Sequence, residues 1–540
     1  MPPTFGDFRF KDLVATMELQ SLASCLAILL VGAFFLAGVC HRRGCHGRKY
    51  NLPPGPRPWP VIGNLNHIGT LPHLSLHILA KRYGPFMSLR LGSVPVIVGS
   101  SVDAARFFLK THDTAFLDRA RTAVGRYTLY NCSNMSWSPY GPYWRQARKL
   151  WQAELFSAKC LMSQEHVRVE EVRAMLRDLW VASSSAGSRN AVTLRDHLLM
   201  VSLNVVSRLV QGKKYISEER PDTGTTPKEF RWMIDELFVL MGVLNIGDMI
   251  PWLNCLDLQG YIRRMKRVSK MFDGFLEHVL DEHNERRQRE GKEFVVLDMV
   301  DQLLQLADDQ NLEVPIHRDG VKAFTLDLIA GGTETSAVTV EWAMSEILRK
   351  PEVLAKATEE LDRVVGRSQL VTEADIPNLR YLEAIVKEAM RLHPVAPLLV
   401  PRLSREDTSV GGYDIPTSTR VLINVWAIGR DPTVWEAPTE FRPERFLGSN
   451  VDVKGQHFCL LPFGSGRRMC PGLPLGLIMV HLTLANLLHG FTWRLPYGTA
   501  PEDLSMEEKL GITTPRLVPL KAVAERRLPA HLYAGPSMNE

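Results

Sequence analysis

Cys470 lies in a short loop rich in glycine and arginine, residues 462–472, directly before an apolar run over 473–488 that predicts a helix. Glycines let the backbone approach a flat partner closely. A thiol at a helix N-terminus beside arginines is expected to have a lowered pKa, and the thiolate is the form that binds a metal. Amides around the sulfur could donate hydrogen bonds to it and tune a bound metal. The alternative is a buried structural cysteine in a tight turn.

A second candidate site lies in a long segment, 319–350, that predicts a helix ending before Pro351. We expect Asp319 to cap this helix. Gly331 and Gly332 stand side by side in its middle, where each costs roughly 1 kcal/mol relative to alanine. Thr335 can donate a hydrogen bond to the carbonyl four residues earlier and so bend the helix. Either a ligand comes close here, or the helix is kinked by packing against a neighbour.

Two charged or aromatic pairs sit at helical spacing. Trp144 and Arg148 are one turn apart, which on its own indicates a cation–π pair on a helix surface. Glu388 and Arg391 form an E-x-x-R pair, which on its own is a common surface contact of little energetic weight.

Five residues around the cysteine form the pattern F-x-x-G-x-R-x-C-x-G: Phe463, Gly466, Arg468, Cys470 and Gly472. This pattern resembles the haem-binding signature of the cytochrome P450 family. Residues 330–336 resemble the family's A/G-G-x-D/E-T-T/S helix motif. The resemblance covers the chain to about residue 523, with the motifs in the family's order. It implies the P450 fold, mainly α with a smaller β-rich subdomain, preceded by one N-terminal transmembrane helix.

The resemblance implies a haem-thiolate site. Cys470 would be the axial ligand of the iron in haem b, iron protoporphyrin IX. Other residues would hold the haem, some of them through its propionates: Trp144, Arg148, Arg402, Phe463, Arg468 and Gly472.

The resemblance also implies a monooxygenase reaction. Electrons would come from NADPH through NADPH–cytochrome P450 reductase, and O2 would be the co-substrate. Thr335 and Glu334 would deliver protons during dioxygen activation, by the logic of general acid–base catalysis.

Two further sets of residues follow from the same resemblance. Glu388, Arg391 and Arg445 would form a structural triad that supports haem insertion. Residues 395–400 are apolar at the pocket positions, which indicates an apolar substrate. The loops at 117–137, 244–258 and 511–514 match other substrate-contact stretches of the family. The predicted substrate pocket contains Gly331, Val395, Leu398, Leu399, Thr513 and Thr514.

The N-terminal segment predicts a membrane anchor. Residues 21–40 form an uncharged apolar run long enough to span a bilayer. The basic residues that follow outnumber those before it, which places the rest of the chain in the cytosol. A cleaved secretory signal is the alternative, but its basic residues would come first. The proline-rich stretch 52–58 cannot continue a helix and predicts a hinge. Translation could begin at Met1 or Met17.

We therefore expect a single-pass protein of the endoplasmic reticulum membrane with a catalytic domain in the cytosol. The expected parts are a lumenal stretch, an anchor, a basic and proline-rich hinge, the haem-thiolate domain and a tail, over 1–20, 21–40, 41–59, 60–523 and 524–540. The catalytic unit is expected to be monomeric.

Composition and pattern agree with a large, mainly helical enzyme. The 540 residues are 45% hydrophobic, which supports a large core, and the net charge of +5 does not suggest a nucleic-acid partner. Eight cysteines show no disulfide framework spacing, so reduced thiols are expected. Short alternating runs over 60–110 predict hairpin strands. Helical periodicity dominates 140–390, and strands are expected near 409–415 and 420–424.

The motifs resemble plant microsomal P450s of specialised metabolism, including homoterpene synthases and flavonoid 3'-hydroxylases. The favoured substrate is an acyclic terpene alcohol, nerolidol or geranyllinalool, cleaved oxidatively at a C–C bond. Alternatives are a flavonoid 3'-hydroxylase or another terpenoid, fatty-acid or steroid hydroxylase. Two others are a reductase-independent haem-thiolate isomerase or dehydratase, and a non-catalytic haem-binding membrane protein. One departure is 116–120, Phe-Leu-Asp-Arg-Ala, where many relatives carry F-x-x-R-P.

Overall fold

The computed structural model describes residues 32, 50–184, 191–214 and 225–533. From Leu52 onward the chain belongs to one unit. The expected lumenal stretch and, apart from residue 32, the expected anchor lie outside the described residues.

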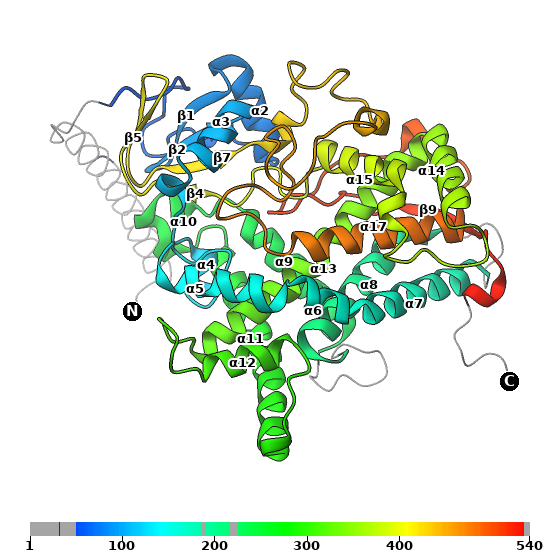
Figure 1. Cartoon of the computed structure of the whole chain (residues 1–540). Coiled ribbons are helices and arrows are strands. Elements are labelled where there is room, and N and C mark those ends of the chain that lie inside the picture. The colour runs from blue at the N-terminus through cyan, green and yellow to red at the C-terminus, as the bar shows by residue number, and fades with distance from the viewer. Residues whose placement is uncertain (1–31, 33–49, 185–190, 215–224, 534–540) are drawn as a thin grey trace, which may run out of the picture. The chain divides into compact units, whose positions relative to one another are not determined.

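Most of the described chain is helical (Figure 1). The α-helices are α2 (Pro72–Tyr83), α3 (Val102–Arg106), α4 (Ala123–Tyr127), α5 (Pro142–Leu150), α6 (Ala158–Ser163), α7 (Glu165–Ser184), α8 (Leu194–Gln211), α9 (Pro227–Gly242), α10 (Ile246–Met249), α11 (Tyr261–Glu290), α12 (Met299–Ala307), α13 (Arg318–Arg349), α14 (Pro351–Val364), α15 (Arg380–Leu392), α16 (Val425–Ile428) and α17 (Leu473–Gly490).

The strands form small sheets, as the sequence pattern predicted. They are β1 (Phe86–Leu91), β2 (Val94–Gly99), β3 (Val192–Thr193), β4 (Arg402–Leu403), β5 (Thr408–Val410), β6 (Tyr413–Ile415), β7 (Arg420–Ile423), β8 (Phe491–Arg494) and β9 (Lys521–Arg526).

The largest sheet has the strand order β1-β2-β7-β4. β1 pairs antiparallel with β2, and β2 pairs parallel with β7. Pro95 lies in the central strand β2, but pairing with β7 begins only at Val96, so the missing N–H breaks no bond to that neighbour. The other sheets have the order β3-β9-β8 and the hairpin β5-β6.

Helix α13 lies between the two largest hydrophobic clusters and contributes buried residues to both. Most of its residues are buried, polar ones included, because it packs against α8, α15 and α17. Gly332 explains the close approach of α8: a Cβ atom there would lie 2.6 Å from a methyl group of Val206. The N-cap of α13 is His317, so the expectation that Asp319 caps it is wrong. Asp319 lies in the first turn, where it pairs with Lys322 at 3.2 Å.

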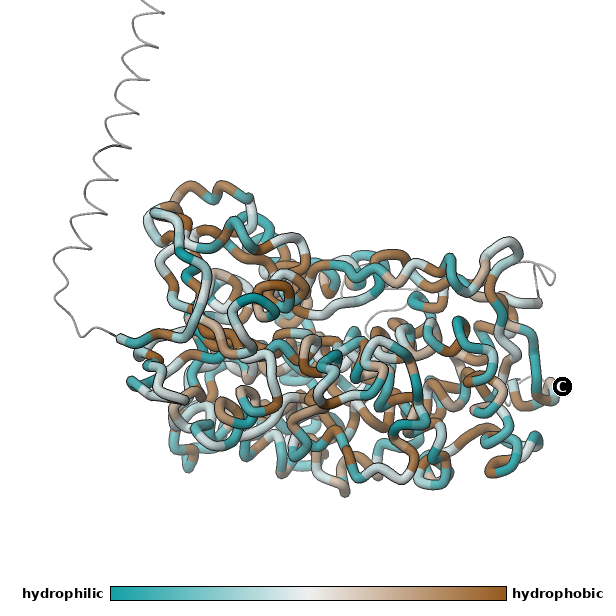
Figure 2. The backbone as a smooth tube through the Cα atoms, turned by 90° about the horizontal axis from the view of Figure 1, so that it is seen from above, coloured by the Kyte–Doolittle hydropathy of each residue, from teal (hydrophilic) through white to brown (hydrophobic). Residues whose placement is uncertain are grey.

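Helix α17 follows the cysteine loop, as predicted. It is the one helix among the described residues that is long and apolar enough to cross a membrane, and 67% of it is buried within the protein. Burial at that level identifies it as a core helix. Figure 2 shows apolar and polar residues interleaved along the backbone of the described chain, the pattern of helices that each bury one side.

The helical run breaks over 244–258, as expected. Helix α9 ends at Gly242, and α10 and a 3-10 helix, Pro251–Leu256, precede α11. The chain at 511–512 packs directly on Gly242, where a Cβ atom would lie 2.2 Å from the Ile512 nitrogen. This contact joins the end of α9 to the turn before β9.

Candidate functional site

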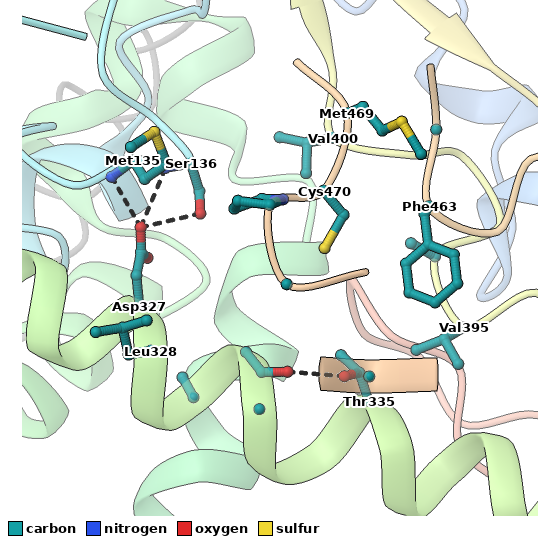
Figure 3. Close-up of a pocket in the computed structure, with 18 of the residues that line it drawn as sticks. Met135, Ser136, Asp327, Leu328, Thr335, Val395, Val400, Phe463, Met469 and Cys470 are labelled. Carbon is teal, nitrogen blue, oxygen red and sulfur yellow. Dashed lines mark hydrogen bonds between the residues drawn. The ribbon is translucent and has the colours of Figure 1, made fainter. Parts of the chain in front are cut away.

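An internal cavity of about 350 Å³ lies between α13 and the cysteine loop. Its walls are mainly apolar, and Figure 3 shows Cys470 and Thr335 on opposite sides of it. The walls come from α5, α8, α9, α13 and α17, and from the segments 135–137, 395–402 and 462–472.

The cysteine loop is held by local backbone bonds. The Cys470 N–H donates to the Phe463 carbonyl at 3.0 Å, and the Met469 N–H to the Gly466 carbonyl at 3.1 Å. Gly466 has φ of +74°, and a Cβ atom there would lie 2.3 Å from the Leu109 carbonyl oxygen, so only glycine fits. The loop thereby presents the Cys470 sulfur to the cavity (Figure 3).

The Cys470 thiol has a raised pKa in the protein alone, and the expected lowering is wrong. The Cys470 side chain is exposed to the cavity, but the protein around it excludes bulk water, and this desolvation raises the pKa. The amides of Gly472 and Leu473 and the charge of Arg148 lower it. The helix terminus and the cation favour the thiolate, but desolvation disfavours it more strongly. The same amides and cation favour a thiolate once a metal is bound, because a coordinating metal deprotonates the thiol outright.

Four arginines converge on one end of the cavity: Arg119, Arg148, Arg402 and Arg468. Burial and the repulsion of neighbouring cations lower the pKa of Arg468 to about 9 and that of Arg119 well below its ordinary value. Arg402 pairs with Asp113 at 2.6 Å.

Arg119 and Arg468 donate hydrogen bonds to backbone carbonyl oxygens, which carry no charge to balance these cations. Arg119 donates to the carbonyls of Val400 and Pro401 at 2.7 and 2.6 Å, and Arg468 donates to that of Leu117 at 2.9 Å. The cluster therefore suits a ligand with more than one anionic group.

Trp144 and Arg148 face the cavity but do not pair with each other in the way their spacing suggested. The Arg468 guanidinium lies 4.3 Å from the centre of the Trp144 ring. Arg148 donates instead to the Met469 carbonyl at 2.7 Å. Both residues thus connect α5 to the cysteine loop, Trp144 through Arg468 and Arg148 through Met469. Trp144 also donates to the Met135 carbonyl at 3.1 Å.

The opposite wall is the middle of α13. The Thr335 hydroxyl donates to the Gly331 carbonyl at 2.7 Å, which confirms the predicted bond back along the helix. A Cβ atom at Gly331 would meet no atom within 4 Å, because this glycine faces the cavity. The two glycines therefore have different roles: Gly332 allows α8 to pack closely, and Gly331 leaves space in the cavity beside Thr335.

Glu334 does not line the main cavity with Thr335. It lies on a neighbouring cavity of about 280 Å³. Thr513 donates to its Oε1 at 3.0 Å, and among the described residues its buried Oε2 has no hydrogen-bond partner. Burial raises the pKa of Glu334 to about 8, so the carboxyl is protonated at neutral pH. Thr513 lines the main cavity and thus connects the two spaces.

Comparison with known proteins identifies the family. A family model described as "Cytochrome P450" matches residues 53–520. The chain belongs to the cytochrome P450 family.

The relatives of this P450 match it over nearly its whole length. Trimethyltridecatetraene synthase and dimethylnonatriene synthase of Zea mays are each 50% identical, covering 95% and 96% of this chain and 95% and 99% of their own. Flavonoid 3'-monooxygenase of Petunia hybrida is 44% identical over 90% of this chain and 94% of its own. A zebra fish cytochrome P450 structure with abiraterone superposes with a TM-score of 0.69 at 25% identity, covering 84% of this chain and all of the other.

The P450 is therefore a haem-dependent monooxygenase that uses O2 and electrons passed from NADPH by a reductase. The residues present fit the haem. The cavity has a thiol on one side, an open glycine and a hydroxyl on the other, and four arginines at one end, of which Arg119 and Arg402 are buried and Arg148 and Arg468 are half-buried. Two propionates would supply the negative charge that the cluster of cations lacks. All seven residues predicted to hold the haem line this cavity: Trp144, Arg148, Arg402, Phe463, Arg468, Cys470 and Gly472.

Four of the six predicted substrate residues line the main cavity, and two do not. Gly331, Val395, Leu399 and Thr513 line the main cavity. Leu398 lines an adjacent cavity of about 150 Å³ instead. Thr514 lies outside both linings, in contact with the backbone: its N–H donates to the Val395 carbonyl at 2.9 Å, and its own carbonyl accepts from the Trp342 ring at 2.9 Å.

The structure brings the predicted triad together. Arg391 donates to Glu388 at 2.7 and 2.8 Å, and Arg445 donates to the same carboxylate at 2.9 Å. Glu388 and Arg391 are fully buried. Arg391 also donates to the carbonyls of Pro438 and Glu440, so the network holds the loop that precedes the cysteine.

Sequence reasoning missed two residues of the cavity, Arg119 and Asp327. Arg119 lies in the expected substrate-contact loop 117–137, but it was not predicted as a cation facing the cavity. Asp327 is a carboxylate within an apolar stretch of α13, and a buried charge among apolar residues was the available signal.

Proposed function

We propose that this P450 converts an acyclic tertiary allylic terpene alcohol, nerolidol or geranyllinalool, into a homoterpene by oxidative C–C cleavage. The observation that carries the proposal is the 50% identity, over almost the full length of each chain, to two maize enzymes named for homoterpene products. A mainly apolar cavity supports it, since an acyclic terpene offers little but hydrocarbon to its surroundings.

The reaction balances with one O2 and one NADPH. The alcohol loses two hydrogens and splits into the homoterpene and a small unsaturated ketone. Dioxygen is reduced to two water molecules, for which NADPH and a proton supply the other two hydrogens. Haem bound at Cys470 supplies the activation of dioxygen.

The protein's own groups position the substrate and move protons. The apolar walls at Val395 and Leu399 hold the chain of the terpene and exclude water. The Thr335 hydroxyl, on the wall facing Cys470, accepts and passes a proton at its oxygen. Glu334, protonated at neutral pH and bonded to Thr513, stores a proton one step from the cavity.

Turnover assays test the substrate. Membranes containing this protein and a plant reductase are incubated with NADPH and nerolidol, geranyllinalool or naringenin, and products are identified by mass spectrometry. Homoterpene is expected from the terpene alcohols, and none from the Cys470→Ser variant. Absence of terpene turnover by a protein that binds haem and oxidises naringenin would refute the proposal.

The second candidate is flavonoid 3'-hydroxylation, favoured by the 44% identity to the Petunia enzyme. Naringenin in the same assay separates the two. A reductase-independent isomerase or dehydratase would act without NADPH. Thr335 in the cavity and the names of the relatives speak against it and against a non-catalytic haem protein.

We also propose that residues 1–20 are lumenal, 21–40 anchor the protein in the endoplasmic reticulum membrane, 41–59 form the hinge and 60–523 form the monomeric catalytic unit in the cytosol, followed by a tail. The apolar run and the basic residues after it support this arrangement. At the described end of the hinge, the Pro53 and Pro54 carbonyls accept hydrogen bonds from Ser88.

A further inference from the structure

Asp327 accepts four hydrogen bonds from one short loop. Its Oδ1 accepts from the Asn134 amide at 2.8 Å. Its Oδ2 accepts from the Met135 N–H at 2.8 Å, the Ser136 N–H at 3.1 Å and the Ser136 hydroxyl at 3.2 Å. Figure 3 shows this carboxylate reaching from α13 to the loop at the edge of the cavity. One side chain thus joins the central helix to three consecutive residues of a segment without regular structure.

Cations hold the carbonyls of the same loop. Arg119 donates to the Ser136 carbonyl at 3.0 Å, and Arg468 donates to the Ser138 carbonyl at 2.8 Å. The loop therefore turns its N–H groups toward an anion, Asp327, and its carbonyls toward cations. Hydrogen bonds to charged partners are about twice as strong as neutral ones, so this arrangement defines the orientation of the peptide units.

The backbone before the loop is strained. Tyr130, Asn131 and Cys132 have φ of +49°, +55° and +63°. Three successive non-glycine residues with positive φ each cost roughly 1–2 kcal/mol. Such a conformation persists only where the surrounding contacts over-determine it. The bonds to Asp327 come directly after the strained residues and supply such contacts.

The held loop forms part of the cavity wall. Met135, Ser136 and Trp137 all line the cavity, and so does Asp327. Burial raises the pKa of Asp327 to about 6, whereas the donors of Asn134 and Ser136 lower it. A carboxylate is costly in such a place, and an apolar residue would serve simple packing better. The hydrogen bonds to the loop are what offsets that cost.

We propose that Asp327 is the positioning residue that fixes the 134–137 segment as a wall of the active cavity and so determines which bulky molecules this P450 admits. The inference depends on the cavity and on haem binding. It does not depend on whether the substrate is a terpene or a flavonoid.

Amide exchange tests the tether directly. Hydrogen–deuterium exchange of the Met135 and Ser136 amides is measured in the haem-loaded protein and in Asp327→Ala. We expect the variant to exchange at these amides about tenfold faster or more, because it loses bonds to a charged acceptor. Wild-type exchange rates in the variant would overturn the proposal.

Asp248→Ala is the matched control. Asp248 accepts from the Ala123 N–H at 2.8 Å, so it holds the backbone of the same stretch of chain through a carboxylate. This variant should accelerate exchange at Ala123 and leave Met135 and Ser136 unchanged. Equal acceleration at Met135 and Ser136 in both variants would mean general loosening and would also overturn the proposal.

Ligand selectivity gives a second readout. Imidazole and the bulky azole clotrimazole are titrated by the optical shift that each causes on binding the haem iron. Asp327→Ala should change the clotrimazole Kd by about tenfold and leave that of imidazole nearly unaltered, since only the bulky ligand contacts the wall. Equal changes for both ligands would refute a role in shaping the cavity.

Asp327→Asn keeps one acceptor oxygen for the loop amides and should fall between wild type and alanine in both measurements. If the alanine variant fails to take up haem, the asparagine variant is used to test the role of Asp327. Faster exchange of Met135 and Ser136 together with altered clotrimazole affinity supports the proposal, and wild-type behaviour in both overturns it.

Discussion

Thr335 and Glu334 are neighbours in sequence but face different spaces. Thr335 lines the cavity opposite Cys470, whereas Glu334 lies on the neighbouring cavity and is bonded to Thr513. Successive residues of a helix point about 100° apart, which lets these two side chains face different cavities. Thr513 is the residue that both lines the main cavity and is bonded to Glu334, so it lies between the two side chains.

Replacing Thr335 by alanine should uncouple electron use from product. The cavity loses the hydroxyl that donates to the Gly331 carbonyl, and with it a positioned proton carrier. We expect product per NADPH to fall about 100-fold while hydrogen peroxide rises, the lower end of the usual contribution of a general acid. Product and peroxide are measured against NADPH oxidation. Unchanged coupling would contradict the role, and Thr335→Ser should restore most of it.

Glu334 should make stability depend on pH. Burial raises its pKa from 4.5 to about 8. A pKa raised in the folded state contributes stability that is fully present below pH 4.5 and is lost as pH rises through about 8. Unfolding by denaturant at several pH values should show wild type losing about 1 kcal/mol per pH unit relative to Glu334→Gln between pH 5 and 8. Parallel profiles for the two proteins would show that the carboxyl is not protonated in the native state.

At the scale of elements, α13 has two functions in one stretch of sequence. Its buried sides pack on α8, α15 and α17, while its middle must leave room for a haem. The adjacent glycines separate these demands, because only Gly332 meets another helix.

Substitutions of Gly331 and Gly332 by alanine should therefore change the free energy of unfolding in opposite directions. Each change removes about 1 kcal/mol of helix penalty. Gly331→Ala meets no atom within 4 Å, so the free energy of unfolding should rise by about that amount. Gly332→Ala places a methyl 2.6 Å from Val206, so a net loss of about 1–3 kcal/mol is expected. Denaturant unfolding of both variants checks this. Equal effects would contradict the assignment of the close contact to Gly332.

At the scale of the whole molecule, buried charges connect segments far apart in sequence. The Glu388–Arg391–Arg445 network joins α15 to the loop before the cysteine. Removing one member of a buried pair leaves an uncompensated charge and costs 3–5 kcal/mol by analogy with other buried pairs.

Glu388→Gln should consequently destabilise the protein by about 3–5 kcal/mol and reduce haem retention. Glu444→Gln is the control: Glu444 pairs with Lys356 at 2.6 Å, but the pair is partly exposed, so its loss should cost less than about 1 kcal/mol. Unfolding and haem content are measured for both. Similar losses in the two variants would show that burial of the triad is not what matters.

Deleting residues 1–40 should weaken membrane binding and leave haem binding intact. The described unit begins at Leu52 and contains every residue of the candidate haem site. Sedimentation with vesicles and the haem absorption spectrum measure the two properties. Loss of haem from the truncated protein would mean that the N-terminal segment belongs to the catalytic fold.

The family, the place of Cys470 on the cavity wall and the long central helix could be predicted from sequence because each depends on local pattern. Cys470 sits in a spaced motif, and the bond from Thr335 to Gly331 needs only one helical turn. The hairpin strands and the break at 244–258 likewise follow from short-range periodicity.

Other features depended on contacts between distant segments, which no local pattern contains. Desolvation of Cys470 reversed the expected shift of its pKa, and the loop at 511–514 gave Glu334 its partner. Arg119 joined the cluster of cations from 283 residues before Arg402, and Asp327 met a loop nearly 200 residues earlier in the chain. The sequence by itself determined the kind of chemistry, because a thiolate motif is local. Only the tertiary structure decided which side chains share the cavity and how water is kept from them, because burial and charge at one point are summed over the whole fold.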